Sequence, residues 1–251
     1  MLESEFGLPQ AVRACLFDLD GVLTQTAQLH AAAWKRMFDA FLQARAAATG
    51  APFVEFDAAH DYPLYVDGKP RDEGTRSFLA SRGIRLPEGT MADPATADTI
   101  EGLSKRKNEI LLTLMREEGV QVYSGSMRYL QAVREAGLHT AVVSSSRNCP
   151  EVLASAGITD LFEARIDGAV ADAQHLRGKP APDTYLAAAR AVATPPEEAA
   201  VFEDALAGVE AGRAGAFGFV VGVDRMGQID LLRRHGADRV VSDLADLLDR
   251  P

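Results

Sequence analysis

The sequence predicts an α/β protein, with a doubly wound, Rossmann-like parallel-sheet core and an inserted helical domain. From about residue 122 onward, short apolar runs that suit buried strands alternate with helical patterns, which is typical of a parallel sheet covered on both faces. One further strand run precedes residues 26–121, where only helical patterns occur. We therefore expect residues 1–25 and 122–251 to form the core and residues 26–121 to form the inserted domain.

The first strand is expected within residues 12–19, a short apolar run that ends in an acidic turn. Helices are expected at residues 26–48, 72–81 and 99–118. In the first of them the apolar residues recur at roughly helical spacing, at Leu29, Ala33, Phe38, Phe41 and Leu42. The first strand must belong to the core sheet, so the helical block is an insertion after strand one.

The second half of the chain supplies the other core elements. Strands are expected at residues 139–143, 164–166, 199–202, 217–223 and 239–241. Helices are expected at residues 127–136, 151–156, 182–192, 205–214 and 229–235, followed by a tail helix. Gly137 is expected to end the first of these helices.

Composition narrows the classes of partner. The 251 residues are 47% hydrophobic and carry a formal net charge of −10, which argues against a general nucleic-acid binder. The longest apolar stretches are too short to span a bilayer. The opening MLESEFGLPQ lacks an export pattern, and Cys15 and Cys149 do not make a disulfide framework. We expect a cytoplasmic monomer with no nucleic-acid or membrane partner.

Four polar clusters each follow a predicted strand, at the edge where open parallel sheets bind ligands. The first contains Asp18 and Asp20. Residues two apart on an extended chain point the same way, so both carboxylates can face one site. Such a pair suits a nucleophile with an acid–base partner, or two metal ligands. The alternative is an ordinary acidic turn.

The second and third clusters could hold an anion. Residues 144–148, of sequence SSSRN, place hydroxyls and backbone N–H groups before a helix, although they could simply cap that helix. Lys179 lies just before a proline-primed helix start, so its ammonium could reach a pocket as a point charge. A solvated surface lysine is the alternative reading.

The fourth cluster is the acidic pair Glu203 and Asp204. Paired carboxylates at a strand end suit a hard cation such as Mg²⁺, which takes one or two carboxylates and keeps waters. Acids also favour a helix N-terminus because of its dipole. The occurrence of all four clusters in this order on successive strand ends favours one shared site.

In that order, the motifs resemble those of the haloacid dehalogenase-like superfamily, over nearly the whole predicted sheet domain. The resemblance implies that Asp18 is the nucleophile that forms an aspartyl-phosphate and that Asp20 is the general acid and base. It also implies that Ser144 and Lys179 hold the transferring phosphoryl group.

The same resemblance implies a Mg²⁺ cofactor, bound by Asp18, the backbone carbonyl of Asp20, and the pair Glu203 and Asp204. The ion and Lys179 would offset the repulsion between an attacking carboxylate and an anionic phosphate. Asp20 also argues against dehalogenation, which does not need this second acid.

The helical insertion has a narrower resemblance, to the β-phosphoglucomutases. It is carried by TQTAQLH at residues 24–30, Trp34-Lys35, GKPR at residues 68–71 and KRKN at residues 105–108. Two features depart from the family pattern: Gln25 stands where relatives commonly carry an acid, and the stretch of residues 44–65 is longer than usual.

This second resemblance implies further site residues. His30 would assist the acid–base residue, Lys107 would contact the substrate, and Arg71 would grip the phosphate that is not being transferred. The other substrate-binding residues expected are Trp34, Ser145, Ser146, Arg147 and Asn148. As alternatives, Arg71 and Lys107 could be solvated charges, and His30 and Trp34 could only pack a helix.

The expected activity is interconversion of β-glucose 1-phosphate and glucose 6-phosphate through phospho-Asp18. The expected substrate is therefore a phosphorylated small molecule, and in particular a sugar phosphate. The main alternative is a phosphatase of small phosphorylated metabolites with the same machinery. A catalytically silent regulatory module would require a broken acid set, whereas all four acids are present. A phosphonate hydrolase that forms a Schiff base on a lysine of the insertion is a further alternative.

Overall fold

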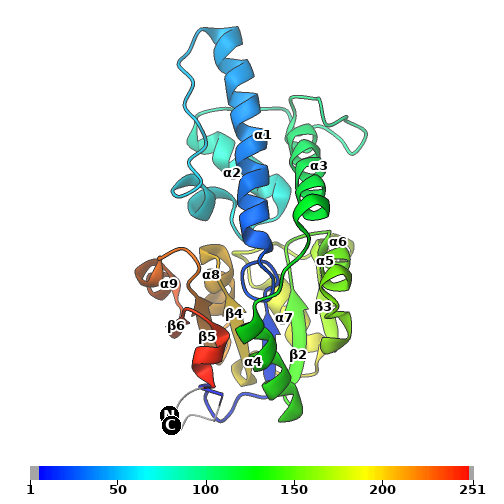
Figure 1. Ribbon diagram of the computed structural model, residues 1–251, viewed down its shortest axis with the longest axis vertical. Coiled ribbons are helices and arrows are strands. Elements are labelled where there is room, and N and C mark those ends of the chain that lie inside the picture. Colours follow the sequence, from blue (N-terminus) through cyan, green and yellow to red (C-terminus); the bar gives the residue numbers. More distant parts are fainter. Residues whose placement is uncertain (1–5, 249–251) are drawn as a thin grey trace. The chain divides into compact units, whose positions relative to one another are not determined.

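The computed structural model describes residues 6–248 (Figure 1). The chain divides into two compact units, one containing the residues up to Gln25 and from Val120 onward, the other Thr26–Gly119. Residues 1–5, which begin the segment without an export pattern, lie outside the described residues. So do residues 249–251, at the end of the predicted tail helix.

The first unit is built on a six-stranded sheet in the order β3-β2-β1-β4-β5-β6, and every neighbouring pair is parallel. The strands are β1 (Ala14–Phe17), β2 (His139–Val143), β3 (Ala164–Ile166), β4 (Ala199–Glu203), β5 (Phe219–Val223) and β6 (Arg239–Val241). From β1 the chain builds outward to β2 and β3, then returns to β4 on the other side of β1. This order confirms the predicted doubly wound fold and makes the carboxyl edge near β1 a topological switch point.

Strand register brings the predicted clusters together. Phe17, the last residue of β1, pairs with Val142 of β2 and Phe202 of β4. The residues that follow each of them therefore reach the same edge of the sheet, and the Asp18 N–H donates to the Phe202 carbonyl at 2.9 Å. All four side chains of β1 are buried, as expected for a strand covered on both faces.

The helices of the first unit are α4 (Ser124–Glu135), α5 (Cys149–Ala156), α6 (Gly168–Ala173), α7 (Asp183–Ala191), α8 (Leu206–Ala214) and α9 (Ile229–His235). Short 3₁₀ turns occur at Thr159–Leu161, Pro196–Glu198 and Leu244–Leu247, and the last of these stands where the tail helix was expected. The sequence did not predict α6. Its N-cap Asp167 accepts hydrogen bonds from Ala169 and Val170, and it has no buried face to produce an apolar period.

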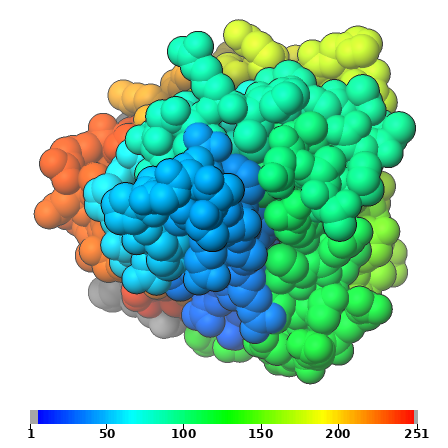
Figure 2. All heavy atoms as spheres, turned by 90° about the horizontal axis from the view of Figure 1, so that it is seen from above, coloured from blue at the N-terminus to red at the C-terminus, as the bar shows by residue number. Residues whose placement is uncertain are grey.

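The second unit is helical, with α1 (Thr26–Thr49), α2 (Arg71–Ser81) and α3 (Ile100–Glu118). A short π-helix, η1 (Tyr62–Val66), was not predicted. Figure 2 shows the blue surface of α1 between the cyan segment that leads into α2 and the green α3. The core of this unit is an aromatic cluster in which Phe38 stacks with Trp34 at 5.2 Å and with Phe56 at 5.3 Å between ring centroids.

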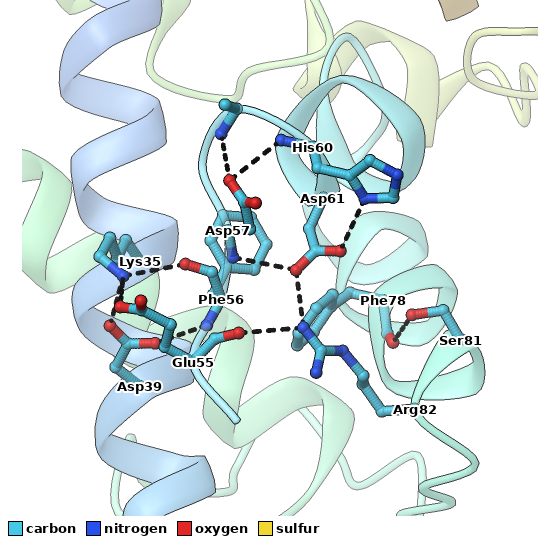
Figure 3. Close-up of polar contacts among 11 residues, drawn as sticks. Lys35, Asp39, Glu55, Phe56, Asp57, His60, Asp61, Phe78, Ser81 and Arg82 are labelled. Carbon is cyan, nitrogen blue, oxygen red and sulfur yellow. Dashed lines mark hydrogen bonds and ion pairs between the residues drawn. The ribbon is translucent and has the colours of Figure 1, made fainter. Parts of the chain in front are cut away.

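The stretch between α1 and η1 is extended, and charged residues hold it against the helices (Figure 3). The Lys35 ammonium donates to Glu55 at 2.7 Å and to the Phe56 carbonyl at 2.9 Å. The Phe56 N–H donates to Asp39 at 2.7 Å. These bonds fix Phe56 in the aromatic core. None of the helices within residues 6–248 has the combination of length and apolar character needed to cross a membrane.

Candidate active site

A buried lysine lies at the centre of the carboxyl edge. The Lys179 side chain is 1% exposed, and its ammonium donates to the carboxylates of Asp18 and Glu203. It also donates to the Val143 carbonyl at 3.3 Å, so three strand ends converge on one cation. The solvated-lysine reading of Lys179 is therefore wrong, because the position is inaccessible to bulk water.

The charges at this edge do not balance. Burial raises the pKa of the Asp18 carboxyl well above its ordinary value, and the negative charges of Glu203 and Asp20 add to this while Lys179 opposes it. Burial alone would lower the pKa of Lys179, but Asp18 and Glu203 outweigh it and raise that pKa. A further positive charge would stabilise ionised Asp18.

Glu203 is held by contacts on both carboxylate oxygens. The Tyr185 hydroxyl donates to Oε1 at 2.9 Å, and the Ala205 N–H donates to Oε2 at 3.1 Å. A β-carbon at Gly208 would lie 1.8 Å from Oε1, so only glycine fits against this carboxylate. The carboxylate is thus both buried and fixed in orientation.

The acidic pair of the first strand lies in a tight turn. The Leu23 and Thr24 N–H groups both donate to the Leu19 carbonyl at 3.0 Å, and the Gly21 N–H donates to the Thr24 carbonyl at 2.8 Å. Gly21 has a φ of +92°, a conformation that favours glycine. The Ser144 hydroxyl lies 3.4 Å from an Asp20 oxygen, which places the second cluster beside the first.

The site can accommodate a divalent cation. Asp18, Glu203 and Asp204 each offer a carboxylate oxygen, and the three oxygens lie within 4.8 Å of one another. A β-carbon at Gly21 would lie 1.8 Å from Asp204 Oδ2, so this carboxylate packs directly on the turn that carries Asp20. Buried oxygen donors with surplus negative charge are compatible with a hard cation such as Mg²⁺.

The loop after β2 is organised by its own serines. The Ser144 hydroxyl accepts from the Ser146 N–H and the Ser146 hydroxyl from the Asn148 N–H, both at 3.1 Å. Arg147 is 38% exposed and donates to Asp172 of α6 at 2.7 Å. Ser145 and Asn148 are partly buried in the same loop. A phosphate at Arg147 would therefore compete with Asp172.

In the second unit, three of the predicted residues lie together. The Lys107 ammonium is 3.1 Å from His30 Nδ1 and 5.1 Å from the centre of the Trp34 ring. Because ammonium only donates, a charged Lys107 requires Nδ1 as the acceptor and leaves the imidazole proton on Nε2. Lys107 is 3% exposed, so it is not a solvated charge.

Arg71 begins α2 and is connected to the helix that carries Lys107. The Arg71 carbonyl accepts from the Thr75 hydroxyl at 3.0 Å, and Thr75 contacts Ser104 of α3 at 3.1 Å. Both hydroxyls are buried. The contact between Thr75 and Ser104 fixes how the start of α2 packs against the face of α3 that holds Lys107.

Comparison with known proteins identifies the family. The model of the haloacid dehalogenase-like hydrolases matches residues 12–215, which span β1 to α8. The chain belongs to this hydrolase family. A β-phosphoglucomutase of Mycobacterium bovis is 58% identical over 245 residues, which cover 96% of this chain and 94% of the relative. The β-phosphoglucomutase of Bacillus subtilis is 30% identical over 94% of this chain and 92% of its own length.

A solved structure agrees with the family assignment. The β-phosphoglucomutase of Clostridium difficile superposes with a TM-score of 0.71 and 25% identity, over 94% of this chain and 93% of that one. Both resemblances read from the sequence, to the superfamily and to its β-phosphoglucomutase-like branch, are thereby confirmed.

Two contacts of this haloacid dehalogenase-like site were not predicted. Tyr185 stands in an alanine-rich helix, yet its hydroxyl meets Glu203 and its ring centre lies 5.0 Å from the Lys179 ammonium. Arg225 follows β5 and donates to the Gly21 carbonyl at 2.8 Å. The available signals were the single aromatic side chain of an alanine-rich helix for Tyr185 and a fifth strand end for Arg225.

Proposed function

We propose that this enzyme interconverts β-glucose 1-phosphate and glucose 6-phosphate through a phosphoryl group carried on Asp18. The observation that carries the proposal is the contact of buried Lys179 with Asp18 and Glu203, in a chain 58% identical to a β-phosphoglucomutase over nearly its full length. Mg²⁺ is the proposed cofactor, held by Asp18, the Asp20 carbonyl, Glu203 and Asp204. When bound, it offsets phosphate charge and orients the reacting oxygens.

The residues of the first unit carry the transfer. An Asp18 oxygen attacks phosphorus as the bond from phosphorus to the sugar oxygen breaks, and Asp20 gives its proton to that oxygen. In the reverse direction Asp20 takes the proton of the attacking sugar hydroxyl. Lys179 and Ser144 hold the phosphoryl oxygens. Positioning and charge stabilisation supply most of the acceleration in such transfers.

A mutase must also hold a sugar bisphosphate while the sugar turns over. We propose that Arg71 grips the phosphate that is not being transferred, because its guanidinium can form a bidentate fork with phosphate oxygens. The loop residues Ser145, Ser146, Arg147 and Asn148 would bind the same group, with the phosphate displacing Asp172 from Arg147. His30, Lys107 and Trp34 would contact the sugar and support Asp20.

The test is a coupled assay for glucose 6-phosphate formed from β-glucose 1-phosphate, with Mg²⁺ and a trace of glucose 1,6-bisphosphate, while free phosphate is monitored. Glucose 6-phosphate without matching phosphate release supports the mutase. Release of phosphate in place of glucose 6-phosphate would assign the enzyme to the phosphatases and leave the Asp18 chemistry intact.

A further inference from the structure

Arg225 contacts backbone carbonyls from two separate segments of the first unit. Its Nε donates to the Gly21 carbonyl and its Nη1 to the Ser242 carbonyl, both at 2.8 Å. The side chain is 15% exposed, and Asp243 lies 3.8 Å from Nη1. A planar guanidinium suits such paired bonds because its donors are fixed in direction.

The same guanidinium stacks on Tyr123, with its central carbon 3.5 Å from the ring centre. Tyr123 lies where the chain re-enters the first unit. Its N–H donates to the Leu23 carbonyl at 3.0 Å, and the Gln25 N–H donates to the Gln121 carbonyl at 2.8 Å. Arg225 therefore contacts both the turn after Asp20 and Tyr123, in the segment by which the chain re-enters the first unit.

This arrangement has a cost in free energy. Arg225 Nη2 is buried and has no hydrogen-bond partner within residues 6–248. A buried donor without a partner is unfavourable, because it gives up its hydrogen bonds to water on folding and gains none in return. Fold stability alone therefore accounts poorly for an arginine at this position, and unsatisfied groups of this kind are expected at functional sites.

We propose that Arg225 is a positioning residue for the metal site, an inference that rests on the proposed Mg²⁺-dependent function. Its bond to the Gly21 carbonyl fixes the turn that carries Asp20. Asp204 packs against the same turn so closely that a β-carbon at Gly21 would lie 1.8 Å from its Oδ2. A shift of Gly21 therefore moves Asp204 and the Asp20 carbonyl together, and both are proposed ligands.

The test is calorimetric titration of Mg²⁺ alone into metal-stripped Arg225→Gln, together with kcat and KM for p-nitrophenyl phosphate. Loss of a residue that orients metal ligands typically weakens affinity or activity by about 10- to 100-fold. We expect the dissociation constant for Mg²⁺ to rise by about tenfold and kcat to fall, with KM nearly unchanged.

Arg239→Gln is the matched control. Arg239 also donates to a backbone carbonyl, that of Gly7 at 2.6 Å, and faces an aromatic ring, Phe219 at 5.7 Å. It stands at the first residue of β6, away from the carboxyl edge. We expect this variant to lose thermal stability and keep its Mg²⁺ affinity.

An unchanged Mg²⁺ affinity in Arg225→Gln, or an equal loss in both variants, would overturn the proposal. If Arg225→Gln does not fold, Arg225→Lys replaces it, because lysine keeps the charge but lacks the planar fork. Unchanged affinity in Arg225→Lys would likewise overturn it. The metal affinity is measured without a sugar substrate. A negative result in the mutase assay would therefore leave this test of Arg225 unaffected, and the two outcomes can be told apart.

Discussion

Arg82 donates a 2.7 Å hydrogen bond to the carboxylate of Asp61 and closes a loop of chain between them (Figure 3). Asp61 immediately precedes η1, and Arg82 immediately follows α2. The enclosed segment carries Arg71, the proposed phosphate anchor. Asp61 is 5% exposed and also accepts from the Asp57 N–H at 2.9 Å.

The ion pair between Arg82 and Asp61 predicts that the protein loses stability in acid. Burial would raise the pKa of Asp61, but the bonds from the Asp57 N–H and Arg82 outweigh it and lower that pKa. The unfolded chain therefore binds the proton more tightly, so the stabilisation is present above the unfolded pKa of about 4 and is lost as pH falls through the lower folded pKa. Asp61→Asn should lower the Tm near neutral pH, and its difference from wild type should shrink below about pH 4.

Differential scanning calorimetry across pH measures this effect. Asp98→Asn is the control, because Asp98 is 68% exposed and lies 3.6 Å from Arg106, a pair expected to contribute little. If the Tm difference between Asp61→Asn and wild type does not vary with pH, the stabilisation does not come from the ionised carboxylate of Asp61, which would contradict this prediction.

Asp18→Asn should abolish transfer and keep the fold. The amide preserves shape but is a poor nucleophile, and loss of a nucleophile typically costs at least about a thousandfold in kcat. Lys179 keeps Glu203 as a partner, and the crowded carboxylates lose one negative charge. Circular dichroism should match the wild type, whereas a normal rate of sugar phosphate turnover would refute Asp18 as nucleophile.

Gly21→Ala should damage the site more than a comparable glycine change elsewhere. The new methyl would lie 1.8 Å from Asp204 Oδ2, in backbone with φ of +92°. Gly137→Ala is the matched control, because Gly137 has φ of +81° and open space around it. Both should lose about 1–2 kcal/mol of stability from the left-handed backbone, but only Gly21→Ala should weaken Mg²⁺ binding and turnover. Equal kinetics in the two variants would show that Asp204 does not depend on this turn.

Arg71→Ala should impair conversion of β-glucose 1-phosphate more than hydrolysis of p-nitrophenyl phosphate, which has no second phosphate to grip. A lost charge-assisted bond is expected to cost about 2 kcal/mol, or roughly thirtyfold in kcat/KM. Arg76→Ala on the same helix provides the comparison, because Arg76 is 45% exposed and pairs with Glu88. Equal losses on both substrates would argue against an anchor at Arg71.

The strands and the clusters at their ends were predictable from local pattern. Residues buried on both faces, as in β1, give unbroken apolar runs, and parallel order then brings Asp18 and Glu203 to one edge. Lys179 reaches the same edge from the segment between α6 and α7, so the expectation that its cluster directly follows a strand was wrong. The contact of Tyr185 with Glu203 was not predictable, because it depends on how α7 is rotated against the sheet. Local periodicity does not fix that rotation in a helix rich in alanine.

The same limit of local sequence pattern explains which elements of the second unit were predicted and which were missed. Its helices α1 and α3 follow from apolar spacing, whereas the extended stretch around Phe56 is held by Lys35 and Asp39, some twenty residues earlier in the chain. The π-helix η1 is five residues long, which is too short for apolar spacing to distinguish it from a turn. Such elements depend on contacts formed only once the chain has folded.

The most direct test of the central claim is a single-turnover transfer from Asp18. Enzyme phosphorylated with labelled glucose 1,6-bisphosphate is separated from free ligand, its labelled residue is located by mass spectrometry, and excess β-glucose 1-phosphate with Mg²⁺ is added. We predict that the label lies on Asp18 and passes into sugar phosphate, with little released as inorganic phosphate. Label on another residue, or its release to water while the sugar stays unlabelled, would contradict the account.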